Sequence, residues 1–185
     1  MPNYYSHSIV PPLRLAFFMW VLFSIEFYLG FDLGWLGIYP RTFSGAIGIL
    51  TSPMIHGSLH HIFSNTLPLI LLGSTLYMFY NAIAIRVFIQ CYVLTGILVW
   101  IFGREFYHIG ASGLIYGLAF FLISYGLFRK DFKSLSISII VVLLYGGLVY
   151  GVLPTRSEIS WESHLFGALV GIGTAYTLKD AHETA

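Results

Sequence analysis

The sequence predicts an all-α fold, a polytopic bundle of six membrane-spanning helices, and three observations support it. Of the 185 residues, 57% are hydrophobic and 9% are charged, whereas an average soluble domain carries about 25% charged residues. The mean hydropathy is +0.81. Apolar runs of near-bilayer length follow one another along the chain. A net charge of +1 gives no reason to expect a nucleic-acid partner.

Six apolar runs are long enough to cross most of a bilayer, which takes about 17–25 helical residues. They cover residues 15–31, 61–80, 82–102, 112–128, 135–153 and 163–178. We expect one membrane domain at 14–179, between an N-terminal tail at 1–13 and a C-terminal tail at 180–185. The first run is interpreted as a retained span because no small-residue cleavage site follows it. Its Glu26 is costly in lipid and should face protein or the membrane boundary.

Residues 32–60 are expected to form a long first loop that lies in the membrane interface. Glycines and prolines are too dense there for one spanning helix. These breakers are Gly34, Gly37, Pro40, Gly45, Gly48, Pro53 and Gly57. The segment is nevertheless apolar, with side chains such as Trp35 and Phe43 that favour the interface over water. Loops of this length are usually functional.

The positions of Lys and Arg predict the orientation of the bundle. With a cytoplasmic N-terminus, six of the nine Lys and Arg residues lie on the inner side and three on the outer side. This arrangement places the first loop, residues 104–111 and residues 154–162 on the external side.

The motif Gly110-Ala111-Ser112-Gly113 stands at the head of the fourth span and points to a nucleophilic serine. The glycines let the backbone turn sharply, and the helix N-terminus offers unpaired N–H groups to a developing oxyanion. The alternative is structural, because small residues are common where membrane helices pack closely.

His164 heads the sixth span and is the best candidate for the base that a nucleophilic serine needs. Ser112 and His164 lie about 25 and about 22 Å from the inner basic edge at 1.5 Å per residue, so their depths agree. His164, Gly167 and Gly171 share one helix face, along which the fourth span can approach. Tyr116 lies one turn below Ser112, where it could stack on the imidazole or simply pack.

The second span adds His61 and Asn65 one turn apart, which could donate hydrogen bonds to an oxyanion. A metal site is the rival interpretation, since His56, His60 and His61 with His164 could offer nitrogens. No His-Glu-x-x-His motif occurs and no carboxylate accompanies the cluster, so we expect no metal and no cofactor. No Asp is in place to orient His164, which indicates a Ser–His dyad. His7, His60, His108 and His182 are expected only to satisfy groups at the interface.

Three separated motifs together resemble the rhomboid intramembrane serine proteases, in the six-helix form found in many bacteria. They are Gly110-Ala111-Ser112-Gly113 with Tyr116, His164 with Gly167 and Gly171, and His56 with His61 and Asn65. The resemblance implies that Ser112 is the nucleophile and His164 the general base. It also implies that Asn65, His61 and the Ser112 N–H form the oxyanion hole, next to Gly110, and that Tyr116 stacks on His164.

The sequence therefore predicts a serine endopeptidase of the plasma (inner) membrane that cleaves transmembrane protein substrates near the external face. The main alternative is a non-catalytic rhomboid-like factor that binds membrane proteins. A small transporter or channel is disfavoured because no internal repeat is evident. The substrate, the cleavage-site preference, the gating element and the oligomeric state are left open by the sequence.

Overall fold

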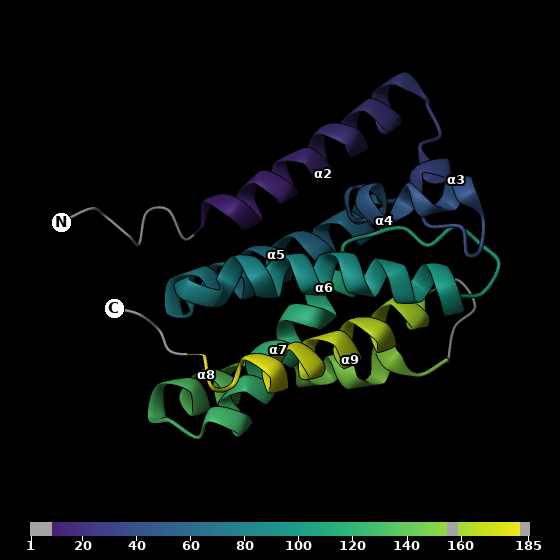
Figure 1. Cartoon of the computed structure of the whole chain (residues 1–185). Coiled ribbons are helices and arrows are strands. Elements are labelled where there is room, and N and C mark those ends of the chain that lie inside the picture. The colour runs from purple at the N-terminus through teal and green to yellow at the C-terminus, as the bar shows by residue number, and fades with distance from the viewer. Residues whose placement is uncertain (1–8, 155–158, 182–185) are drawn as a thin grey trace.

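The computed structural model describes residues 9–154 and 159–181, and its regular structure is helical. An isolated antiparallel bridge between Ile38 and His108 is the one β-type pairing in these residues. The long helices are α2 (Val10–Leu29), α5 (Leu59–Phe79), α6 (Asn81–Phe102), α7 (Ser112–Arg129), α8 (Phe132–Tyr145) and α9 (Trp161–Leu178). The predicted all-α bundle is confirmed. The start of α2 and the end of α9 lie on the same side of it (Figure 1).

Five helical stretches in the described part of the chain are long and apolar enough to span a membrane, so this is a multi-pass membrane protein. They are α2, α5, α6, α7 and Phe132–Val152, which joins α8 to a 3-10 segment, η3 (Gly146–Val152). The predicted sixth span, α9, is as long as α7 but is not among them. Its first turn carries the polar residues Glu162 and His164, which lower its apolar character.

Helix α2 begins at Val10 rather than near residue 14, because Pro11 and Pro12 form its first turn. Proline suits this place, where a backbone N–H has no helical partner to lose. Near the other end of α2, Glu26 accepts a hydrogen bond from the Leu33 backbone N–H at 3.2 Å. The carboxylate therefore lies at the helix boundary, as expected.

The first loop contains no spanning helix and folds into four short turns. These are η1 (Gly34–Leu36), α3 (Phe43–Ala46), α4 (Gly48–Thr51) and η2 (Ser52–Met54). Phe43 is 95% exposed, and Ile47 and Leu50 are exposed beside it, which suits a segment in the membrane interface. The loop is tied to the bundle by the Trp100 indole, which donates to the Thr42 carbonyl at 2.9 Å.

Helices α7 and α9 form the tightest pair in the bundle. A Cβ added at Gly167 would overlap the Gly113 carbonyl oxygen, and one at Gly171 would overlap that of Gly117. The glycine face predicted on the sixth span thus meets α7, backbone against backbone. Close approach of this kind gives van der Waals contact that holds membrane helices together.

Candidate active site

Ser112 is the first residue of α7 and follows a loop that is constrained at Gly110. Gly110 has a φ of +103°, and a Cβ there would lie 2.5 Å from His61 Nε2, so this position demands glycine. The Gly110 N–H donates to the Ser52 carbonyl at 2.9 Å. Ala111, the N-cap, offers no side-chain acceptor to the first turn of α7. Backbone N–H groups at the start of α7 therefore face no capping side chain.

The imidazole of His164 connects Ser112 to a backbone carbonyl. His164 Nε2 lies 2.9 Å from Ser112 Oγ, and His164 Nδ1 lies 2.9 Å from the Gly151 carbonyl oxygen. Because a carbonyl can only accept, Nδ1 must carry the proton and Nε2 then accepts from the serine hydroxyl. The ring is thus held in the tautomer that a general base needs.

Gly151 was not identified from the sequence, where its segment was expected to be an ordinary span. It lies in η3, where the α-helix gives way to a 3-10 segment that begins at Gly146 and includes Gly147. The signal that could have found it is the density of glycines at 146, 147 and 151 near the end of an otherwise apolar run. No aspartate orients His164 among the residues described; a backbone oxygen occupies that place.

Tyr116 stacks flat on His164. The ring centroids are 4.1 Å apart and the interplanar angle is 1°. A Cβ at Gly151 would overlap the Tyr116 hydroxyl and come within 3.3 Å of His164 Nδ1. Glycine at 151 is therefore required for its carbonyl and the Tyr116 ring to approach the imidazole together.

A cavity of about 610 Å³ opens beside the serine–histidine pair. Its lining includes Ser112, His164, His61, Asn65 and Tyr116, together with hydrophobic residues from the loops and from η3. The Asn65 amide is buried and donates one hydrogen bond to the His61 carbonyl at 2.8 Å. An amide has two N–H hydrogens, so a second donor is available to a ligand.

The other histidines divide between packing and the cavity rim. His108 is buried, and its Nε2 lies 3.0 Å from the Arg104 carbonyl oxygen. Burial lowers its pKa below the ordinary value. His60 lines the cavity. His7 and His182 lie outside the described residues. No group of three or more potential metal ligands occurs within 9–154 and 159–181.

His56 is fully enclosed beside the His61 ring. It is 1% exposed, and the two ring centroids are 4.8 Å apart. Burial, and after it the charge that His61 can carry, lowers the pKa of His56 to about 3. His56 is therefore neutral at physiological pH and acts as a packing residue behind His61.

Comparison with known proteins identifies one domain in the chain. A family model described as Rhomboid domain matches residues 43–181. Uncharacterized proteins of Mycobacterium tuberculosis and Mycobacterium bovis are each 35% identical over 157 residues, covering 77% of this chain and 63% of the relative. An uncharacterized protein of Mycobacterium leprae is 34% identical over 141 residues, covering 71% and 56%. The chain thus spans less than two thirds of the length of these relatives.

Proposed function

This chain belongs to the rhomboid family, and from that premise we propose that it is an intramembrane serine endopeptidase, which cleaves spanning segments of other membrane proteins. One observation carries the proposal. The Ser112 hydroxyl contacts His164 Nε2 while the Gly151 carbonyl holds the opposite ring nitrogen. A serine whose hydroxyl faces the unprotonated nitrogen of a fixed imidazole is set up for nucleophilic attack.

In the proposed reaction, Ser112 Oγ attacks the carbonyl carbon of a substrate peptide bond and His164 Nε2 takes its proton. The imidazolium keeps its Nδ1–H on the Gly151 oxygen, which stabilises the positive charge in the absence of an aspartate. When the tetrahedral intermediate collapses, Nε2 gives the proton to the leaving amine. A water molecule then gives a proton to His164 Nε2 and attacks the acyl carbon. The proton returns to Ser112 Oγ as the acyl group leaves.

The oxyanion of the intermediate is bound at the start of α7 in this account. The Ser112 N–H lies at the positive end of the helix, and no capping side chain competes for it. Asn65 and His61 line the same cavity and supply further donors. Gly110 allows the His61 ring to lie close to the serine loop.

The substrate has to present an extended segment to this site, because each peptide bond of an intact helix is shielded by its own turn. We therefore propose that the substrates are membrane proteins whose spanning helix unwinds near the external face. The distribution of Lys and Arg supports a cytoplasmic N-terminus and a site open to the external side of the plasma membrane. Cysteine accessibility at the ends of α5 and α6 tests this orientation.

The test is cleavage in proteoliposomes of single-span reporter proteins, with and without a Gly-Pro break near the external face. The wild-type protein is expected to cut the broken span, with the cut located by mass spectrometry. Ser112→Ala and His164→Ala should abolish the cut. If all three proteins bind the reporter and none cleaves it, the non-catalytic alternative gains support.

A further inference from the structure

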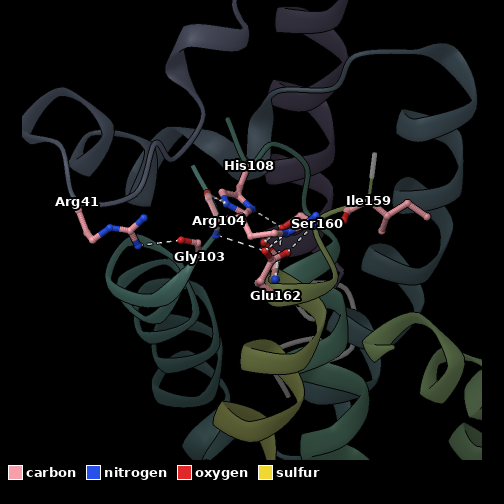
Figure 2. A network of polar contacts seen from close by, with 8 residues as sticks. Arg41, Gly103, Arg104, His108, Ile159, Ser160 and Glu162 are labelled. Atoms are coloured by element: carbon pink, nitrogen blue, oxygen red, sulfur yellow. Dashed lines mark hydrogen bonds and ion pairs between the residues drawn. The ribbon is translucent and has the colours of Figure 1, made fainter. Parts of the chain in front are cut away.

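A polar network at the edge of the cavity joins the loop before Ser112 to the helix that carries His164 (Figure 2). Its centre is the ion pair between Arg104, in the α6–α7 loop, and Glu162, in the first turn of α9. The Arg104 Nε donates to Glu162 Oε1, and Nη2 donates to Oε2 at 3.1 Å. The Arg104 backbone N–H also donates to Oε1, at 3.3 Å.

The environment of this pair is asymmetric. The Glu162 side chain is 2% exposed, whereas that of Arg104 is 40% exposed. A buried carboxylate needs an opposite charge and hydrogen bonds, and Arg104 supplies both in forked geometry. Arg104 Nη2 also donates to the Ile159 carbonyl at 3.1 Å. Arg104 thus contacts both the segment just before α9 and the first turn of α9.

A second contact runs parallel to the first. His108 Nδ1 lies 2.6 Å from Ser160 Oγ, and Ser160 caps α9 by accepting from the Ser163 N–H. Because His108 Nε2 faces the Arg104 carbonyl, Nδ1 is the acceptor and the Ser160 hydroxyl donates to it. Loop, cap and ion pair therefore form one connected unit.

The two residues of the second contact have the same sequence spacing from Ser112 and from His164. His108 lies four residues before Ser112, and its partner Ser160 lies four residues before His164. Arg104 and Glu162 lie outside the residues that line the cavity. They touch no reacting atom, so any effect on the reaction passes through the backbone that carries the two functional side chains.

We propose that Arg104 and Glu162 are positioning residues, which set the approach of Ser112 Oγ to His164 Nε2 by fixing the α6–α7 loop on the first turn of α9. This proposal rests on the proposed function of the serine–histidine pair. A displacement of about 1 Å between reacting groups is enough to cost a hundredfold in rate. Loosening the ion pair should therefore slow the reaction without removing either reacting group.

The test compares rates of covalent labelling by a fluorophosphonate probe in detergent. Glu162→Gln keeps the side-chain volume and leaves only the half-exposed Arg104 unpaired, so folding should survive. We expect its labelling rate constant to fall at least tenfold while the final labelled fraction stays complete. Arg104→Lys, which keeps the charge but loses the fork, should fall between Glu162→Gln and wild type.

The matched control is Glu105→Gln. Glu105 is adjacent to Arg104 in sequence and pairs with Arg41 at 3.3 Å, but its side chain is 74% exposed and the pair does not reach α9. Its labelling rate should stay within twofold of wild type. An unchanged rate constant in Glu162→Gln overturns the proposal. So does a lower labelled fraction at an unchanged rate constant, because that pattern means lost folding rather than lost positioning.

Failure of the proposed function gives a different pattern, since the wild-type protein itself would then stay unlabelled. In that case the Ser112→Cys variant provides the readout. The rate at which iodoacetamide alkylates Cys at this position depends on contact with His164, which favours the thiolate. The reaction requires no hydrolytic activity. Adding Glu162→Gln should slow this alkylation at least tenfold, and equal rates with and without Glu162→Gln contradict the positioning role.

Discussion

Ser112, His164 and the Gly151 carbonyl lie on two parts of the bundle that differ in how closely they are packed. Ser112 and His164 belong to α7 and α9, whose backbones touch at paired glycines, and 67% of the spanning stretch of α7 is buried. The Gly151 carbonyl belongs to η3, at the end of a stretch of which 17% is buried. The proposed nucleophile and base thus lie on two helices in direct backbone contact, while the carbonyl that accepts from the proposed base comes from the least buried of the five spanning stretches.

This difference separates two tasks. The α7–α9 pair fixes the distance between Ser112 and His164, which the proposed reaction needs in every cycle. The Gly151 carbonyl in η3 accepts from His164 Nδ1 and so fixes the proton on that ring nitrogen, and Leu148 of the same segment lines the cavity.

Gly167→Ala should have the largest effect, because its Cβ would overlap the Gly113 carbonyl and drive α9 away from α7. We expect a loss of about 3 kcal/mol in the free energy of unfolding and loss of activity. The measurement is the thermal unfolding midpoint in detergent. Gly173→Ala lies on the same helix with nothing within 4 Å of the added Cβ, so it is the control. Equal midpoints for the two variants would contradict close backbone packing of α9 on α7 at Gly167.

Gly151→Ala changes η3 and should affect the rate of fluorophosphonate labelling more than the stability of the protein. Its Cβ would overlap the Tyr116 hydroxyl, which disturbs both the stacked ring and the carbonyl on His164 Nδ1. We expect the labelling rate constant to fall about a hundredfold, equivalent to about 2.7 kcal/mol. The measurement is fluorophosphonate labelling at matched protein concentration.

Tyr116→Phe in the same chain removes the overlapping hydroxyl and should restore part of the rate lost in Gly151→Ala. Gly147→Ala is the control, since it lies in the same 3-10 segment and an added Cβ there meets nothing within 4 Å. A Gly147→Ala rate as low as that of Gly151→Ala would mean that flexibility of η3, rather than the carbonyl contact, governs the base.

His56, which lies outside both regions, should make a smaller contribution to the free energy of unfolding, and this contribution depends on pH. Its native pKa of about 3 lies below the ordinary value of 6.5, so the unfolded chain binds a proton that the native protein does not. This contribution is complete above pH 6.5 and is lost as pH falls toward 3. Between pH 8 and pH 5.5 the loss is about 1.4 kcal/mol. His56→Gln should remove this part of the pH dependence of the unfolding midpoint, and an unchanged slope would contradict it.

The sequence predicted what depends on side-chain identity and helical spacing. The glycine face of α9 follows from a period of 3.6 residues, and the similar depths of Ser112 and His164 follow from a rise of 1.5 Å per residue. The Gly151 acceptor could not be predicted this way, since every residue carries a carbonyl and only the fold selects one. The early start of α2 was missed because residues 1–13 were assigned to a tail, although Pro11 and Pro12 suit the first turn of a helix. The Arg104–Glu162 pair joins residues 58 positions apart, and nothing local in the sequence indicates it.

Peptide mapping of the fluorophosphonate-treated protein shows whether Ser112 is a nucleophile activated by His164. We expect one phosphonyl adduct, on Ser112, that is absent in Ser112→Ala and in His164→Ala. Ser160, which also contacts a histidine and lines the cavity, provides an internal reference and should stay unmodified. A folded wild-type protein that carries no adduct, or one that carries it on Ser160, would contradict the claim.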